Sequence, residues 1–378
     1  MQNFRFLLFA GLLAIASVGH SQIAPGAVAP AAPSSSTAAA VPSPAPPVPL
    51  LWKVSDQDNA VYILASFHLL KSSDYPLSPD VYAAFADAEQ LLFELAPEEM
   101  ASPTLGTQMG QAALRIDGTR LDQELTPALA ARLKAWAKSN QAALQKAGIT
   151  IDALQSFEAW FVALTISIIE MTELGLDPKL GLDMHFASAA KQAGKPAGGL
   201  ETGEQQIAFL DTMNNVEQLQ MLAEALDESE QGRAQIETLH RLWRQGNGDG
   251  IWREAAIEMK AMYPKLYQRI NVERNDNWLQ KIEQRLRQSK DDTLLIVGAL
   301  HTLGSDGIVA KLAAKGYKVE RICSACAIPE IIFDDLSEDG LGEDDVSEDD
   351  VSEDDVGEND LDRSDPVDKD SDKKEPSK

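Results

Sequence analysis

Two stretches of this chain follow the same plan of an apolar strand, a histidine, a helix and a second strand. The first reads VYILASFHLL and leads to a helix over 79–88 and the strand LLFEL; the second reads TLLIVGALHTL and leads to a helix over 308–315 and the strand YKVERI. Short apolar runs of this kind predict buried strands. His68 and His301 therefore occupy equivalent places, just past the end of a strand, where open α/β sheets bind their ligands.

The segment between these two units has a helical pattern almost throughout. Its run AWFVALTISII has no charge but is too short to cross a membrane, so it predicts a buried core helix. Helices are expected over 128–146, 153–174, 182–192, 203–213, 216–245, 251–261 and 264–288, with one short strand over 196–200. Strands and helices alternate at both ends, so the predicted class is α/β, with α+β as the alternative. The central sheet would be built from two strand–xxHis–helix–strand units, with a large helical insertion between them.

The first residues predict an export signal. Arg5 supplies positive charge, and the apolar run FLLFAGLLAIA after it has the length of a signal-peptide core. Small residues at Gly19 and Ser21 place cleavage before Gln22. Residues 1–21 are therefore expected to be a signal peptide, and the mature protein to be periplasmic or secreted. The alternative is a buried apolar segment at the N-terminus.

Two compositionally biased segments flank the part that is expected to fold, residues 51–330. Residues 22–50 consist mainly of Ala, Pro, Ser and Val, which predicts an extended linker. Residues 331–378 contain the repeated unit GEDDV, SEDDV, SEDDV, GENDL, and the last 45 positions hold 21 acidic and 5 basic residues. Such charge density predicts a disordered tail that aids solubility. Weak Ca²⁺ binding and contact with a basic partner are the alternatives.

The charge balance narrows the choice of partners. The whole chain has a formal net charge of −26, so phosphate backbones and anionic lipid surfaces would repel it. No nucleic-acid partner and no integral membrane segment after signal cleavage are expected. A peptide or small-molecule substrate remains possible, and the sequence leaves the oligomeric state open.

Candidate catalytic residues come from the ends of the predicted strands. Two imidazoles, His68 and His301, together with a carboxylate, form a common catalytic metal arrangement. Glu94 lies near the end of the strand that follows His68, so parallel neighbouring strands would bring the two side chains to one edge. Glu201 ends another strand and could join them or act as a base. The alternative for each histidine is a hydrogen-bonded structural role, and His240, in a polar helix, is expected at the surface.

Cys323 and Cys326 form a CxxC sequence just after the last strand. In a cytoplasmic protein this spacing would suggest zinc binding or thioredoxin-like chemistry. A thioredoxin-type motif opens a helix after a first strand, which is not the context here, and one CxxC cannot fill a zinc site alone. In an exported chain a local disulfide is the favoured interpretation.

The order of the blocks along residues 50–325 resembles the TraB/GumN family, which is related to the Tiki metalloproteases. The blocks that carry this resemblance are LLWKVSDQDNAVYILASFHLL, YPLSPDVYAAFADAEQLLFEL, LGLDMHFASAAKQAGKPAGGLETGEQQIAFL, YPKLYQRINVERNDNWLQKIEQRL and TLLIVGALHTLGSDGIVAKLAAKGYKVERI. The family typically has two Gly-x-x-His motifs and an acidic residue after the second strand. Those features correspond here to His68, to Gly298 with His301, and to Glu94.

What the resemblance implies is a divalent-metal hydrolase that cleaves an amide, peptide or ester bond. His68, Glu94 and His301 would hold Mn²⁺, Co²⁺ or Zn²⁺, with Glu94 also acting in catalysis. The family's Arg-Asn pair corresponds to Arg274 and Asn275, and its Leu-Glu-Thr block supplies the remaining catalytic candidate, Glu201.

Each of these three further candidates has a structural alternative. Arg274 would stabilise an oxyanion, or form an intramolecular ion pair. Asn275 would orient Arg274 or cap a turn. Glu201 would act as a base or cap the following helix.

One position departs from the family pattern. The first motif reads Ala65-Ser66-Phe67-His68, with alanine where the family has glycine. If this position required a positive φ, alanine would be strained there. The departure favours a rival function, a non-catalytic periplasmic protein of envelope or exopolysaccharide maintenance that keeps the fold without activity. A third hypothesis is an interaction module whose acidic tail recruits a basic partner.

Overall fold

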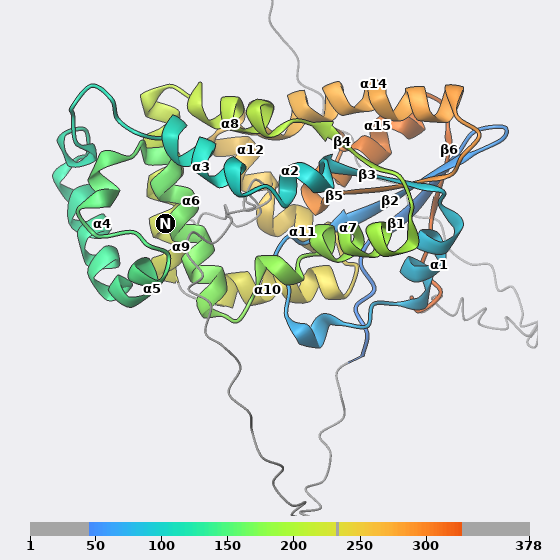
Figure 1. Ribbon diagram of the computed structural model, residues 1–378, viewed down its shortest axis with the longest axis horizontal. Helices are drawn as coiled ribbons and strands as arrows, with labels where there is room; N and C mark the ends of the chain where they lie inside the picture. Colours follow the sequence, from blue (N-terminus) through green and yellow to red (C-terminus); the bar gives the residue numbers. More distant parts are fainter. Residues whose placement is uncertain (1–44, 232–233, 327–378) are drawn as a thin grey trace, which may run out of the picture. The chain divides into compact units, whose positions relative to one another are not determined.

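A computed structural model describes residues 45–231 and 234–326. Six strands form one mixed sheet in the order β4-β3-β5-β2-β1-β6 (Figure 1). The strands are β1 (Leu51–Ser55), β2 (Ala60–Ser66), β3 (Gln90–Leu95), β4 (Ala197–Glu201), β5 (Thr293–Gly298) and β6 (Lys318–Arg321). The mixed helix-and-strand architecture confirms the predicted α/β class. The predicted signal peptide, residues 22–44 of the predicted linker and the whole of the predicted acidic tail lie outside the described residues.

Four neighbouring strands, β4, β3, β5 and β2, run parallel, whereas β1 is antiparallel to both β2 and β6. The two matching units found in the sequence lie side by side, since β2 pairs with β5 along its length, from Val61 with Thr293 to Ser66 with Gly298. Strand β1 was not predicted. Its sequence LWKVS places one long cationic side chain between apolar ones and gives only a weak strand pattern.

Helices cover both faces of the sheet, because alternate residues of its strands are apolar on both sides. Two helices, α14 (Glu273–Gln288) and α15 (Ile308–Ala314), lie on one face, where Ile63, Leu295 and Val297 pack against them. The opposite face, with Leu64 among its residues, joins the main core of the helical part. Figure 1 shows α14 and α15 next to each other on the same face of the sheet.

The long middle is helical, as expected, but its helices are shorter than the sequence pattern indicated. The other helices are α1 (Pro79–Asp87), α2 (Pro97–Met100), α3 (Pro103–Ala112), α4 (Pro127–Ser139), α5 (Gln141–Lys146), α6 (Ala159–Glu173), α7 (Leu182–Ala193), α8 (Gly203–Asp211), α9 (Asn215–Gln231), α10 (Ala234–Arg244), α11 (Gly248–Ala255), α12 (Ile257–Met262) and α13 (Pro264–Tyr267). The apolar run forms α6, whose residues are mostly buried and which packs along α9. This confirms the predicted core helix.

Several of the predicted long helices are interrupted, and two of the breaks have a clear local feature. The helix expected over 128–146 breaks at Asn140, whose side-chain amide turns back to the carbonyl of Trp136 at 3.1 Å. The helix expected over 264–288 contains a π-helical turn, η6 (Gln268–Val272), just before α14. Turns of this kind occur frequently at functional sites, and this one directly precedes the helix that carries Arg274.

The packed part of the chain begins earlier than predicted. Pro47, Pro49 and Leu50 belong to the expected linker 22–50 but are buried. The backbone N–H of Val48 donates to the carbonyl of Arg244 at 2.8 Å, which ties this segment to α10. Proline prevented a strand or helix here but did not prevent packing. No helix among residues 45–231 and 234–326 is long and apolar enough to cross a membrane.

Candidate functional site

The carboxyl ends of the four parallel strands meet at one edge of the sheet, and the candidate residues gather there. His68 follows β2, Glu94 lies in β3, Glu201 ends β4, and His301 lies in the 3-10 turn η7 (Ala299–Thr302) after β5. The strand-end prediction is therefore confirmed as to placement. One detail was wrong: β2 and β3 are not neighbours, because β5 lies between them and brings its last residue, Gly298, to the centre of the site.

Arg274, in the first turn of α14, lies at the centre of this cluster and is 2 % exposed. Its Nη2 donates to Oε2 of Glu94 at 2.6 Å and also to Glu201, and its Nε donates to Oε1 of Glu201 at 3.1 Å. Burial lowers the pKa of Arg274, but the two carboxylates more than offset this and leave the pKa raised. The guanidinium is therefore charged and pairs with both acids, whose two negative charges it offsets in part. In this structure Arg274 forms intramolecular ion pairs, which was the alternative to its role in stabilising an oxyanion.

Glu201 is held by three further side chains. Trp278, one helical turn after Arg274, donates its indole N–H to Oε2 of Glu201 at 3.0 Å, and Gln206 donates to Oε1 at 2.7 Å. The Arg274 guanidinium carbon also lies 4.6 Å from the centre of the Trp278 ring, a cation–π contact. Helix capping, the alternative role of Glu201, falls to Thr202 instead, whose hydroxyl accepts from the backbone N–H of Gln205.

His301 is buried and its ring is oriented by Asn275. Nδ1 of His301 lies 2.7 Å from Oδ1 of Asn275, whose amide nitrogen donates to the carbonyl of Asp306 at 2.8 Å. Because the Asn275 oxygen can only accept, Nδ1 carries the proton and Nε2 presents its lone pair, 3.2 Å from Nη1 of Arg274. Burial, then the charge on Arg274, lowers the pKa of His301 well below its ordinary value. Asn275 thus orients His301, not Arg274 as the sequence suggested.

His68 is oriented in the same way by Asp183, a residue that the sequence did not single out. Its Nδ1 lies 2.8 Å from Oδ2 of Asp183, which also accepts from the hydroxyl of Ser66 at 2.5 Å. Burial alone would lower the pKa of His68, but the Asp183 carboxylate, with help from Glu94, raises it to about 9. The other nitrogen, Nε2, faces Oε1 of Glu94 at 3.9 Å. Asp183 lies two residues before His185 in a predicted helix start, and this position was the one feature of the sequence that could have drawn attention to it. Nothing in the sequence linked Asp183 to β2.

Gly298 leaves open a small space between the candidate metal ligands. Its N–H donates to Oε1 of Glu94 at 2.7 Å. A Cβ atom at this position would lie 3.0 Å from Nε2 of His68, 3.2 Å from Oε1 of Glu94 and 3.5 Å from Cδ2 of His301. The three candidate ligands therefore surround the space beside Cα of Gly298, although His301 turns a ring carbon toward it while its Nε2 faces Arg274.

Ala65, the counterpart of Gly298 in the first motif, causes no strain. It lies within β2, pairs with Val297 and is fully buried, so its backbone is extended and does not need a positive φ. Its methyl group is packed in the buried core of the sheet. The departure from the family's glycine therefore does not disturb the fold at this position.

The side chains of His68, Glu94 and His301 are of the types that bind divalent cations, but in this structure they are not arranged around a single ion site. Metal-bound histidines usually donate their other ring N–H to a carboxylate or carbonyl oxygen, as Asp183 and Asn275 allow here. Among the residues that the structure describes, however, no three His, Cys, Asp or Glu side chains are already positioned around one ion. Arg274 contacts both Glu94 and His301, and so occupies the lone pairs that a cation would take.

The sequence predicted His240 at the surface, and this was wrong: His240 is buried behind the first motif. Its Nε2 lies 2.8 Å from Oδ2 of Asp74, a fully buried carboxylate that also pairs with Arg244. Three residues on, the indole of Trp243 donates to the carbonyl of Ala65 at 3.0 Å. Helix α10 therefore contacts β2, the strand that ends just before His68, and helps to fix its position. The amphipathic pattern indicated the helix correctly, but its charged partner Asp74 lies far away in sequence.

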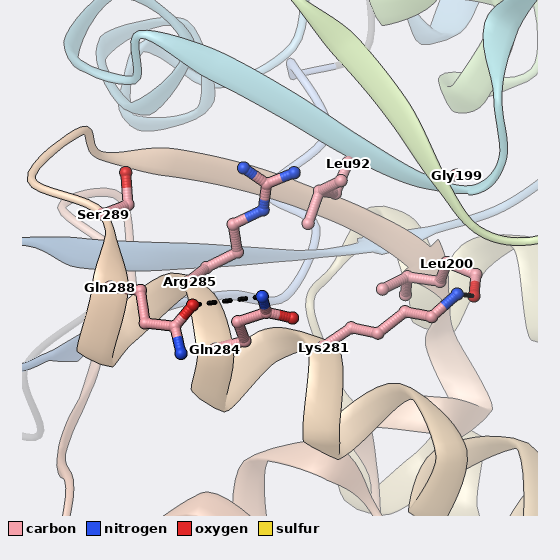
Figure 2. Close-up of a pocket in the computed structure, with 8 residues that line it drawn as sticks. All are labelled: Leu92, Gly199, Leu200, Lys281, Gln284, Arg285, Gln288 and Ser289. Carbon is pink, nitrogen blue, oxygen red and sulfur yellow. Dashed lines mark hydrogen bonds between the residues drawn. The ribbon is translucent and has the colours of Figure 1, made fainter.

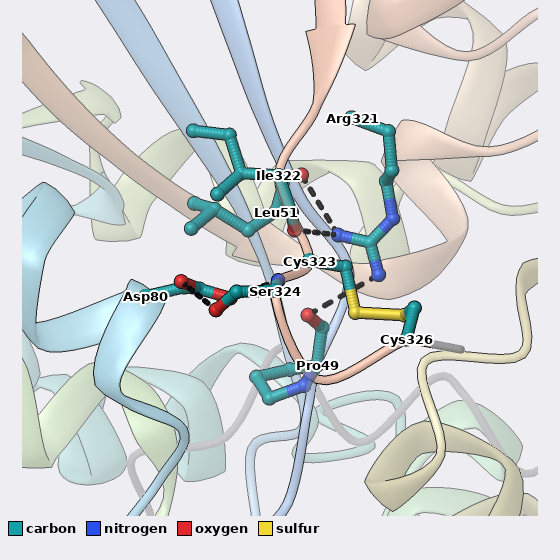
Figure 3. The surroundings of a disulfide bond; sticks show 8 residues. All are labelled: Pro49, Leu51, Asp80, Arg321, Ile322, Cys323, Ser324 and Cys326. Carbon is teal, nitrogen blue, oxygen red and sulfur yellow. Dashed lines mark hydrogen bonds between the residues drawn. A yellow bond between two sulfur atoms is a disulfide. The ribbon is translucent and has the colours of Figure 1, made fainter. Parts of the chain in front are cut away.

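Cys323 and Cys326 form a disulfide just after β6, as the sequence favoured (Figure 3). Beside it, Ser324 is fixed by Asp80, at 2.6 Å from the backbone N–H and 2.5 Å from the hydroxyl. Arg321 donates to the carbonyls of Leu51 and Ile322 at 2.7 and 2.9 Å. The last described residues are thus tied to β1 and α1.

Comparison with known proteins gives one match. The family model described as the TraB/PrgY/gumN family matches residues 50–321, which is most of the chain and almost all of the described part. No curated protein and no solved structure shows significant similarity to it.

Proposed function

Because this chain belongs to the TraB/PrgY/gumN family, we propose that it is a metal-dependent hydrolase of an amide, peptide or ester bond, with its centre at the carboxyl edge of the sheet. The observation that carries the proposal is the matched orientation of two histidines. His68 and His301 each have Nδ1 held by an oxygen, from Asp183 and Asn275, while Nε2 of His68 faces Glu94 and Nε2 of His301 faces Arg274. Metal-binding histidines usually have their other ring nitrogen held by an oxygen in this way.

His68, Glu94 and His301 would hold Mn²⁺, Co²⁺ or Zn²⁺, and the same ligands accept several such ions. When bound, the ion would lower the pKa of a water molecule and polarise a carbonyl. Arg274 would then give up its contact with His301 and keep its pair with Glu201, which leaves part of the guanidinium free to bind a developing oxyanion. Glu201, fixed by Trp278 and Gln206, is better placed to hold Arg274 than to accept a proton from water.

The test is the metal content of the full chain, purified without chelator, beside His68→Ala and His301→Ala. We expect one divalent ion per chain, lost in both variants. His185→Ala is the matched control, because His185 lies in α7 but stacks on Tyr75, 4.5 Å away, outside the cluster. Loss of metal in the control as well, or retention in both variants, would show that the ligands are misassigned. A panel of peptide and ester substrates then tests hydrolysis.

A non-catalytic binding role is the second candidate, and one observation favours it. Arg274 pairs with both Glu94 and Glu201, so each carboxylate already has a cationic partner without a metal ion. A protein of this kind would keep the fold for envelope or exopolysaccharide maintenance. Failure to bind Mn²⁺, Co²⁺ or Zn²⁺ at millimolar concentration would favour this function over the hydrolase.

We also propose that the protein acts outside the cytoplasm. The signal-like N-terminal sequence supports export, and the Cys323–Cys326 disulfide is typical of an oxidising compartment. Sequencing the N-terminus of the protein recovered from periplasm or medium tests this: a mature chain that starts at Gln22 is expected. Recovery of the intact chain in the cytoplasm would contradict it.

A further inference from the structure

Strand β4 forms one edge of the sheet and ends in the candidate site. Its residues Ala197, Gly198 and Gly199 are partly exposed, and Glu201 at its end contacts Arg274. The N–H of Leu91 in β3 donates to the carbonyl of Pro196 at 2.9 Å. Peptide groups alternate between the two sides of a strand, so those of Ala197 and Gly199 face away from β3. Among the described residues, no strand pairs with this outer side of β4.

A pocket of about 460 Å³ lies beside β4, between this edge and the second half of α14. Figure 2 shows Lys281 of α14 reaching the backbone carbonyl of Leu200, while Arg285 points toward Leu92. The polar residues of α14 in its lining are Lys281, Gln284, Arg285 and Gln288, with no acidic residue. In a chain with a net charge of −26, a pocket that carries two cations and no carboxylate is unusual.

Neither cation of the pocket is paired with an acid. Lys281 donates to the backbone carbonyl of Leu200, and Arg285 donates through Nη1 to Oε1 of Gln90 at 2.9 Å. No ion pair links either of them to a carboxylate in the described part of the chain, although most other cations of α14 and α15 have one. The pocket can therefore offer charge-assisted hydrogen bonds to an anionic group.

The spacing of the two cations matches that of side chains on an extended peptide. Lys281 and Arg285 are four residues apart on α14, which is about 6 Å along a helix. Two residues of a strand cover about 6.6 Å, and residues at this separation point to the same side. From Arg274, the same helix places Lys281 about 10 Å away and Arg285 about 16 Å away, or roughly three and five residues of extended chain.

We propose that the outer edge of β4 binds an extended peptide substrate that carries two acidic side chains two residues apart. These side chains enter the pocket beside Lys281 and Arg285, while the backbone pairs with Ala197 and Gly199. The bond to be cleaved then lies three to five residues away, at the Arg274 cluster. This last step rests on the proposed function, whereas binding along β4 does not need the metal.

The test is binding of fluorescein-labelled dodecapeptides to the full chain, followed by fluorescence anisotropy in the presence of EDTA. One peptide has a Glu-Val-Glu centre in a Ser/Thr background, and its partner has Gln-Val-Gln. We expect the acidic peptide to bind roughly tenfold more tightly. Lys281→Glu and Arg285→Glu should each remove this preference. Lys290→Glu, which makes the same charge change at an exposed position just after α14, should preserve it.

The backbone contact has its own pair of variants. Ala197→Pro removes an N–H on the outer side of β4, a substitution that edge strands tolerate, and should weaken binding of both peptides. Ala197→Val keeps the N–H and should bind both as the unaltered chain does. Equal affinity for the two peptides would overturn the acidic preference, and unchanged binding in Lys281→Glu, Arg285→Glu and Ala197→Pro would overturn the location.

Two further outcomes separate this inference from the proposed function. His301→Ala should lose metal but bind the acidic peptide normally. Retention of metal in this variant, with intact peptide binding, would count against the hydrolase alone, whereas loss of metal with no preference for the acidic peptide would count against this inference alone. A chain that ends at Phe333 and binds the acidic peptide far more tightly than the full chain would assign the pocket to the chain's own acidic tail. That result would overturn the proposed occupant.

Discussion

The Arg274 guanidinium lies against the imidazole of His301, with Nη1 and Nε2 3.2 Å apart. This contact places a permanent cation where the proposed metal ion would bind. Histidine can accept it only because His301 is neutral, and burial beside Arg274 keeps it so. Loss of the arginine would therefore affect both the stability of the metal-free chain and its affinity for metal.

Replacing Arg274 by Met should destabilise the metal-free chain by about 3–5 kcal/mol, because it leaves Glu94 and Glu201 buried without a counter-charge. Urea unfolding monitored by circular dichroism measures this loss. Arg287→Met is the control, since Arg287 lies on the same helix but is exposed, where it pairs with Glu283 and donates to the hydroxyl of Tyr317. It should cost less than about 1 kcal/mol. Equal effects of the two variants would show that the Arg274 cluster does not stabilise the fold.

Adding a methyl group at Gly298 should close the space between the candidate ligands. Gly298→Ala would place Cβ 3.0 Å from Nε2 of His68, so metal affinity measured by calorimetry should fall by about tenfold or more. Ala65→Gly, at the equivalent position of the first motif, is the matched control. Its methyl group packs in the core, so removing it should cost about 1 kcal/mol of stability and leave metal affinity unchanged. Metal affinity that survives in Gly298→Ala would exclude this location.

The pair of His68 and Asp183 predicts a pH dependence for the metal-free chain. The pKa of His68 is raised to about 9 in the folded state, against about 6.5 in the unfolded state. The folded chain thus holds a proton that the unfolded chain has lost, and its stability falls as pH rises from 6.5 through 9. The contribution is at most about 3 kcal/mol. Urea midpoints across this range should decline, and His68→Gln should flatten the decline; an unchanged slope would contradict the pairing.

Asp74 should be a strong determinant of stability although it lies outside the candidate site. Asp74→Asn leaves His240 and Arg244 without their shared acceptor and should cost about 3 kcal/mol or more. Asp80→Asn, in the nearby helix α1, makes the same change at a half-buried carboxylate whose hydrogen bonds go to Ser324 and not to a cation, so it should cost less. Thermal unfolding of the three proteins compares them. A loss in Asp80→Asn as large as in Asp74→Asn would mean that burial is not the cause.

The sequence was sufficient for the sheet-edge residues and insufficient for the residues that orient them. His68, Glu94 and His301 could be placed because parallel strands end at one edge, a rule that needs only local patterns. Asp183 and Trp278 could not, because their contacts depend on how α7 and α14 pack on the sheet. The same reason explains His240: a polar helix pattern cannot show that Asp74, far off along the chain, covers its imidazole.

The pairing of β2 with β5 has a consequence for the order in which the protein matures. Val61, near the start of the described chain, finds its partner Thr293 only when almost all of the chain has been made. The first histidine motif therefore stays without its neighbour until β5 has been made. A chain cut short before β5 would carry only part of the site and none of its geometry, so a finished site also shows that the chain has been made at least as far as His301.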